Sequence, residues 1–240
     1  MKMHSSERQT QANDLEVLSR YLPMRGGERI LELGCGAGQT TRELAESHPG
    51  LAILATEVDA IQHDKNLQIK DLPNVTFQLG GAEAIALADS SVHYVILLKS
   101  LHHVPGALLT QSLGEIHRVL KPGGLAYISE PIADGPFNDV LRLFHDEEVV
   151  RRNAFSALEQ AVAAGMFELV EQIFFHEERL YEGFAHFEEQ VLGVTHSHFE
   201  IDAPLLVQIK AAFEQHLDHR GWAEFSTPQR VDLLRRPQES

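Results

Sequence analysis

The stretch ERILELGCGAGQTT, residues 28–41, decides the fold. Its apolar residues Ile30, Leu31 and Leu33 form a run typical of a buried strand, and residues 39–47 have the pattern of a helix that ends before Pro49-Gly50. Between these two segments, glycine stands at every second position: Gly34, Gly36 and Gly38. A glycine-rich turn between a strand and a helix lets the backbone approach a bound ligand closely.

Apolar runs of strand length recur on the C-terminal side of this unit. They are residues 51–56, 75–79, 92–98 and 125–129. Helical spacing of leucines predicts a lead helix that ends before Pro23, and a second helix from Leu109 that stops at Lys121-Pro122-Gly123-Gly124, which we expect to form a turn. Strands that alternate with helices in this way predict a mostly parallel sheet with a ligand crevice at the carboxyl ends of its strands.

The pattern is looser after residue 131. We expect helix up to about Gly165, a strand at residues 167–175, a helix around residues 206–217 and an edge strand at 224–234. This makes seven strands, with extra helices between the sixth and the seventh. No repeat or linker divides the chain, so residues 1–240 are predicted to form one domain.

Charge and composition disfavour several classes of partner. The 20 basic and 35 acidic residues give a net charge of −15, which repels nucleic acid and anionic membranes. The single cysteine, Cys35, excludes internal disulfides and CxxC sites. We find no apolar run of signal-peptide or membrane-spanning length and therefore expect a cytoplasmic protein, without a prediction of its oligomeric state.

The glycine spacing and two acids indicate which ligand the crevice binds. A dinucleotide fingerprint requires glycine at position 39, where this chain has Gln39, so a nicotinamide cofactor is disfavoured but stays an alternative. Glu32 precedes the glycines, where its carboxylate can accept from an ammonium group or orient the turn. Glu57 closes the second strand, where an acid can accept from both ribose hydroxyls of an adenosine.

In order, ILELGCGAGQTT, ILATEVD, VTFQLGGAEAI, VHYVILLKSLHHV and RVLKPGGLAYISEP resemble the successive motifs of class I S-adenosylmethionine-dependent methyltransferases of the small-molecule type. The resemblance covers about residues 25–131. It implies an α/β, Rossmann-like sheet with helices on both faces and S-adenosylmethionine as cofactor. Residues 132–240 would then supply the last strands and a helical insertion that shapes the acceptor site.

The resemblance also implies a cofactor site. It places the methionine moiety at the first loop, the ribose at Glu57 with Asp59 as a second choice, and the adenine at the Gly-Gly-Ala-Glu segment, with Leu97 beside the cofactor. The loop residues are Glu32, Gly34, Cys35, Gly36 and Gly38, and the adenine segment contributes Gly81, Ala82 and Glu83. We interpret Cys35 as structural rather than as a nucleophile.

Two residues depart from the family pattern. Gly81 stands where the family usually has an aspartate that contacts adenine, so the amino group of adenine needs another acceptor, such as Glu83 or a backbone carbonyl. His93 stands where the fourth strand usually opens with aspartate, a position that tends to be structural.

The reaction implied by the resemblance is an in-line displacement at the sulfonium methyl group, which depends mainly on holding the acceptor atom about 3 Å away. Should a base be needed, the candidates are His103, His102 and Glu130. The pairs His196-x-His198 and His216-x-x-His219 are explained as well by chance as by metal binding, and we assign no metal site.

We expect the acceptor to be a small molecule, because motifs typical of amide and cytosine methylation are absent from the sequence. One alternative is a protein that binds the cofactor or its demethylated product without transferring a methyl group; a less favoured one is a nicotinamide-dependent oxidoreductase. Phe184 and Phe187 are hypothesised to form part of a lid over an apolar acceptor, or else a core between helices.

Overall fold

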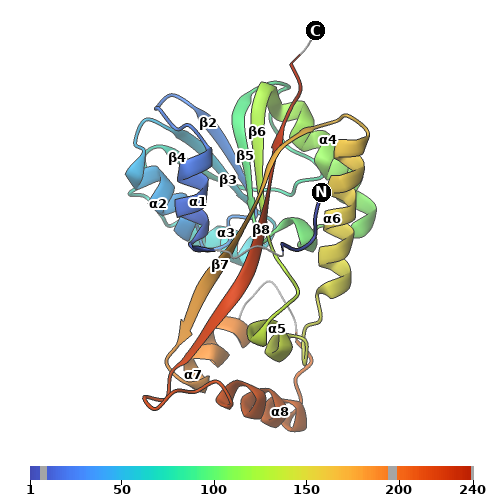
Figure 1. The fold of residues 1–240 in the computed structure, drawn as a ribbon. Helices are drawn as coiled ribbons and strands as arrows, with labels where there is room; N and C mark the ends of the chain where they lie inside the picture. The colour runs from blue at the N-terminus through green and yellow to red at the C-terminus, as the bar shows by residue number, and fades with distance from the viewer. Residues whose placement is uncertain (6–9, 194–198, 239–240) are drawn as a thin grey trace.

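The computed structural model describes residues 1–5, 10–193 and 199–238 (Figure 1). The described strands form one sheet in the order β1-β7-β8-β6-β5-β2-β3-β4. They are β1 (Thr10–Gln11), β2 (Arg29–Leu33), β3 (Ala52–Glu57), β4 (Val75–Leu79), β5 (Val92–Leu98), β6 (Leu120–Pro131), β7 (Glu168–Tyr181) and β8 (Ala223–Arg235). β8 runs antiparallel to β6 and β7, and every other pairing between described strands is parallel.

Helices cover both faces of the sheet (Figure 1). The α-helices are α1 (Asp14–Tyr21), α2 (Gln39–Ser47), α3 (Ala60–Asn66), α4 (Leu109–Val119), α5 (Pro136–Leu141), α6 (Glu148–Ala163), α7 (Phe184–Phe187) and α8 (Ala203–Glu214). Short turns are η1 (Leu101–His103), η2 (Gly106–Leu108) and the π-helical η3 (Glu188–Leu192). Apolar residues of α1 and α2 pack on one face of the sheet, and those of α4 and α6 pack on the other. No helix in the described part of the chain is both long and apolar enough to cross a membrane.

The predicted fold class is confirmed, with one more strand than expected. Thr10 and Gln11 pair with Phe175 and His176, a two-residue strand too short to leave a sequence pattern. The predicted helix at residues 39–47 coincides with α2. The extra helices between the last two strands are also confirmed, as α7, η3 and α8.

Two local predictions are wrong. Residues 224–234 do not form an edge strand, because β8 lies between β6 and β7. Residues 121–124 do not form a turn before the strand but belong to β6, which begins at Leu120. The pairing of β5 with β6 accommodates them as an irregularity: Val92 pairs with Leu120, and the next pair is Tyr94 with Leu125.

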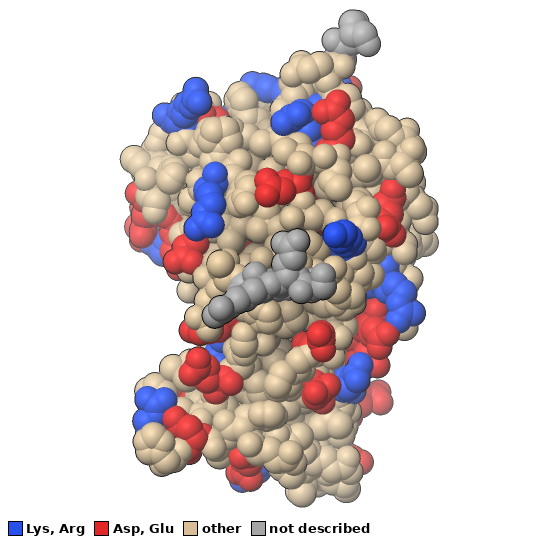
Figure 2. Space-filling view, in the orientation of Figure 1, with Lys and Arg blue, Asp and Glu red and all other residues tan. Residues whose placement is uncertain are grey.

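A helical lobe, which we define as α5, α7, η3 and α8, lies beyond the carboxyl ends of the parallel strands. The lobe is joined to the sheet by β7 and β8: β6 ends at Pro131, opposite Gln229, whereas residues 223–228 of β8 pair with β7 and no longer with β6. β7 and β8 therefore extend past the other strands as an antiparallel ribbon, and the lobe lies at the end of this ribbon (Figure 1). The outline of the molecule narrows between the sheet and this lobe (Figure 2).

Aromatic side chains form the core of the lobe. Phe187 is fully buried, and its ring lies 4.9 Å from that of Phe213 and 5.4 Å from that of Tyr181 between centroids. Of the alternatives for Phe187, the structure therefore supports the core between helices. The half-buried Phe184 packs against the same cluster.

We predict that Phe187→Ala lowers the free energy of unfolding by about 3–5 kcal/mol, because it removes a buried ring and leaves a cavity. Denaturant unfolding followed by circular dichroism measures this change. The matched control is Val207→Ala on α8, whose side chain is 68% exposed and whose truncation should change stability by less than about 0.5 kcal/mol. Equal effects of the two substitutions would contradict the assignment of Phe187 to the core.

Candidate functional site

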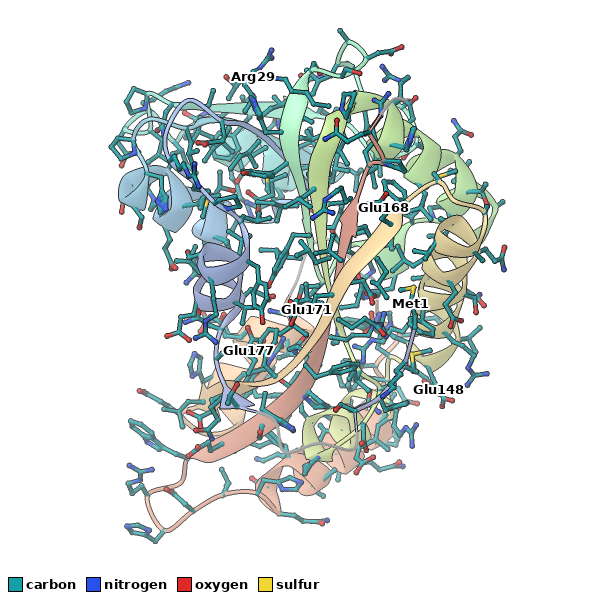
Figure 3. All side chains as sticks on the ribbon, turned by 45° about the horizontal axis from the view of Figure 1, so that its top comes forward. Met1, Arg29, Glu148, Glu168, Glu171 and Glu177 are labelled. Carbon is teal, nitrogen blue, oxygen red and sulfur yellow. The ribbon has the colours of Figure 1, made fainter. Side chains whose placement is uncertain are left out.

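A cavity of about 990 Å³ opens at the carboxyl ends of β2, β3 and β5. This is where the strand order reverses, since β2 lies between β3 and β5, and ligands bind at such points in open α/β sheets. Arg29, at the opposite end of β2, lies far from Glu177 at the crevice side (Figure 3). Most of the predicted site residues line this cavity: Gly34, Gly36, Glu57, Asp59, Gly81, Ala82, Glu83, Leu97, His102 and His103.

The first loop is tied to the neighbouring strand by its backbone. The amide groups of Gly34 and Cys35 both donate to the carbonyl oxygen of Thr56 at 2.9 Å. Gly34 has a φ of +74°, and a β-carbon there would lie 2.7 Å from that of Ser100. Glycine is therefore required by conformation and by space, and the loop backbone borders the cavity directly.

Glu57 connects this loop to the end of β3. Its Oε2 accepts from the Gly36 amide at 2.8 Å, and its Oε1 accepts from the amides of Val58 and Asp59 at 2.8 and 2.9 Å. The buried carboxylate thus brings negative charge to the rim of the cavity. Asp59 also lines the cavity but caps α3, since its Oδ1 accepts from the Ile61 amide at 2.9 Å.

Glu32 lies at a second, smaller cavity of about 420 Å³ on the other side of the loop, with Cys35 also in its wall. The hydroxyl of Thr41 donates to Glu32 Oε2 at 2.5 Å. Burial raises the pKa of Glu32 to about 7, and the Thr41 hydrogen bond offsets only part of that effect. Glu32 is therefore partly protonated near neutral pH and can respond to a cationic ligand group.

Four charged residues that the sequence analysis did not select also line the smaller cavity: Asp14, Glu43, Lys99 and Glu177. Lys99 Nζ lies 2.8 Å from both Asp14 Oδ2 and Glu177 Oε1. Lys99 has a φ of +56° at the carboxyl end of β5, where a lysine directly follows the apolar strand. The change from an apolar strand to a charged residue at position 99 is the sequence signal that could have identified Lys99 as a site residue.

Besides Glu32, two of the predicted loop residues, Cys35 and Gly38, do not line the larger cavity. Burial raises the pKa of the Cys35 thiol well above its usual range, and the charges of Glu32 and Glu57 add to this, so the thiol stays protonated and unreactive. Gly38 is turned toward Phe77, whose ring would lie 3.2 Å from a β-carbon. Its φ of +72° sets the start of α2.

Gly81, where the family usually has aspartate, lies next to the side chain of Glu83. A β-carbon on Gly81 would lie 2.7 Å from Glu83 Oε1 and closer still to Oε2. The carboxylate of Glu83 therefore fills the space that a side chain at position 81 would enter. The departure at His93 lies elsewhere: at the start of β5, its Nδ1 accepts from the Arg29 amide at 2.9 Å and its Nε2 lies 2.8 Å from Lys121 Nζ.

His102 is held between two carboxylates. Its Nδ1 forms a short hydrogen bond with Glu130 Oε2, and its Nε2 lies 3.4 Å from Glu147 Oε1. Burial disfavours the charged imidazolium, but Glu130 and Glu147 outweigh it and raise the pKa of His102 to about 9. Glu130 is buried behind the histidine, whereas the exposed His103 lies beside His102, with the ring centroids 4.1 Å apart and the rings tilted at 41°.

Two further sequence hypotheses concern residues away from the cavity. Phe184 and Phe187 are absent from its wall, which instead contains Phe137 and Phe199. Of the histidine pairs, His196 and His198 lie outside the described residues. The ring of His216 packs on Phe225 at 5.0 Å, and no described cluster of potential metal ligands includes it.

Known proteins resemble this chain over the part that forms the crevice. Residues 30–124 match the family model of a methyltransferase domain. The demethylmenaquinone methyltransferase of Chlorobaculum parvum is 36% identical over 119 residues, which cover 48% of this chain and 46% of that protein. The 27-O-demethylrifamycin SV methyltransferase of Amycolatopsis mediterranei is 31% identical over 111 residues, which cover 45% and 40%. The chain thus matches less than half the length of these relatives.

Solved structures resemble the fold over nearly the whole chain. The YcgJ protein from Bacillus subtilis superposes with a TM-score of 0.66 at 18% identity and covers 94% of this chain and 98% of its own. The family model covers β2 to β5 and the loops between them. The structural similarity also includes the later strands and helices, which the family model does not cover. Residues 30–124 thus match a methyltransferase domain, in agreement with the resemblance of the sequence motifs to class I S-adenosylmethionine-dependent methyltransferases.

Proposed function

We propose that this protein transfers the methyl group of S-adenosylmethionine to a small-molecule acceptor by in-line displacement. The observation that carries the proposal is the cavity of about 990 Å³, which is bordered by the glycine loop and Glu57 on one side and by residues of the helical lobe on the other. Such a volume is at the upper end of small-molecule sites, which suits a cofactor and a second small ligand together.

The residues around the first loop fit the cofactor. Glu32 would face the ammonium of the methionine moiety, the amides of the 34–38 loop would approach its backbone atoms, and Glu57 would accept from the ribose hydroxyls. Glu83 would accept from the amino group of adenine in place of the missing aspartate at Gly81. The bound cofactor supplies an electrophilic methyl group on its sulfonium sulfur.

The acceptor would occupy the part of the cavity toward the lobe, where Phe137, Val191 and Phe199 offer apolar surface and Arg179 and Gln229 offer polar groups. The names of both relatives specify small organic acceptors, which supports this class. Because the lobe completes the cavity, we propose that residues 1–240 act as one unit. The net charge of −15 supports an acceptor other than nucleic acid.

A proton acceptor, where the acceptor group needs one, would come from the corner formed by His102 and His103. Both histidines line the cavity, and Glu130 holds His102 in place from behind. We therefore assign Glu130 a positioning role and keep His103 as the first candidate for the base. His102, whose pKa is raised to about 9, would serve as a base only after it loses the proton that Glu130 and Glu147 stabilise.

The first prediction for this function concerns Glu57. Glu57→Gln removes the charge while keeping the shape, and it should weaken binding of S-adenosylmethionine and S-adenosylhomocysteine at least about tenfold, as expected for lost hydrogen bonds to a charged group. Calorimetric titration measures this, with NADH expected not to bind. Glu214→Gln on α8, an exposed acid, is the matched control. Unchanged affinity in Glu57→Gln would refute the assignment, and binding without turnover on any acceptor would favour the non-transferring alternative.

A second prediction tests whether Glu83 takes the place of an aspartate at position 81 in binding adenine. Glu83→Ala should weaken S-adenosylhomocysteine binding about five- to tenfold, because the amino group of adenine loses its acceptor. Gly81→Asp in the Glu83→Ala background should restore affinity, since the space beside position 81 is then open. The same aspartate in the presence of Glu83 should not improve binding. If the double variant binds no better than Glu83→Ala, the two positions are not exchangeable.

The third prediction is a pH dependence. Glu32 in the free protein has a pKa of about 7, and a cofactor ammonium would favour its ionised form, so binding should release a proton below that pH. The affinity for S-adenosylmethionine should therefore rise from pH 5 to about 7 and then level off. Glu32→Gln, which cannot ionise, should show a flat profile over the same range in calorimetric titrations. A wild-type profile that is equally flat would contradict this role.

A further inference from the structure

Three side chains with metal-binding atoms converge on the wall of the large cavity: His102, His103 and Glu147. One ligand atom of each lies within 4.8 Å of the corresponding atoms of the other two, and no other such group occurs among the residues that the structure describes. The histidines belong to η1, and Glu147 immediately precedes α6. All three line the cavity, and His102 and Glu147 are buried.

Each of the two buried residues is oriented by a partner behind it. The Nδ1 of His102 is engaged by Glu130, whose other oxygen, Oε1, accepts from the Leu101 amide at 2.9 Å. This leaves Nε2 directed to Glu147. In Glu147, Oε2 accepts from Arg151, and Oε1 lies 3.4 Å from His102 Nε2 and 3.0 Å from His145 Nε2. A carboxylate behind a histidine is the arrangement that orients metal-binding imidazoles in proteins.

We propose that His102, His103 and Glu147 form a binding site for one divalent first-row transition metal ion of the Zn²⁺ type. Two imidazoles and one carboxylate are a known donor set for zinc, and sites with three protein ligands keep a coordination position open. Because the ligands line the cavity, that position would face the space that we assign to the acceptor. The surrounding charge agrees with a cation, since Glu130 and Glu147 both border His102.

The ionic contacts of His102 do not by themselves account for His103. A protonated His102 pairs with Glu130, and Glu147 has Arg151 and His145 as further partners, so both carboxylates are satisfied without His103. His103 nevertheless stands beside His102, 4.1 Å away between ring centroids, and brings a ligand nitrogen to the same point from its exposed position. The metal site uses all three residues, and His103 is therefore the residue that distinguishes it from a plain ion network.

A cation at this point would bear on the reaction. Through its open position it could bind an oxygen of the acceptor and polarise it, as metal ions do in other enzymes. This consequence rests on the proposed function, whereas metal binding itself does not. It also indicates acceptors with a hydroxyl or other oxygen donor.

The test uses untagged full-length protein that has been treated with a chelator. Calorimetric titration with Zn²⁺, and visible absorption on titration with Co²⁺, should show one ion per chain at micromolar affinity or tighter. His103→Ala and Glu147→Gln should each weaken binding about tenfold or more. The matched control is His219→Ala, which removes an exposed histidine from the pair near the end of α8 and should bind like the wild type.

A loss of metal binding in these variants can be distinguished from a folding defect. His103 is exposed, so His103→Ala leaves the buried contacts of His102 in place, and circular dichroism checks each variant. No stoichiometric ion, or binding that is the same in His103→Ala as in wild type, would overturn the proposal. S-adenosylmethionine titrations of the same samples separate the two proposals: cofactor binding without metal binding refutes only the metal site, and the reverse refutes only the proposed function.

Discussion

The carboxylate of Glu57 is the contact on which the geometry of the crevice depends. It accepts from the amides of Gly36, Val58 and Asp59, and so joins the loop after β2 to the end of β3. Without it, three backbone donors at the carboxyl edge of the sheet would lose a charged acceptor, which costs more than the loss of a neutral one. The same group that shapes the loop is thereby placed where a ribose would bind.

The acceptor side of the cavity depends on a different constraint, the length of β7 and β8. Their pairing continues past the end of β6 as far as Tyr181 and Ala223, so a hydrogen-bonded ribbon connects the sheet to the lobe. The aromatic core around Phe187 and Phe213 then packs the lobe helices against that ribbon. The cavity therefore has one wall made by the parallel strands and another made by a separate core.

The sequence predicted the elements whose signals are local. Apolar runs bounded by glycines and prolines indicated β2 to β5, and the helix at residues 39–47 was correct at both ends. What failed was non-local: the position of β8 within the sheet depends on which strands it pairs with, and residues 121–124 joined β6 through an irregular pairing with β5. The contact of Glu147 with His102 is also non-local and could not be predicted, because no sequence motif links the segment of Glu147 to that of His102.

The two departures from the family pattern show why position in the fold decides the meaning of a substitution. His93 lies at the amino end of β5, where Arg29 and Lys121 engage its ring, so its partners are structural and remote from the crevice. Gly81 lies at the opposite edge, and the Glu83 carboxylate occupies the volume that a side chain there would need. Under the proposed function, the carboxylate two residues on would supply the acceptor that glycine lacks, so the substitution at position 81 would be an exchange between neighbouring residues and not the loss of a site.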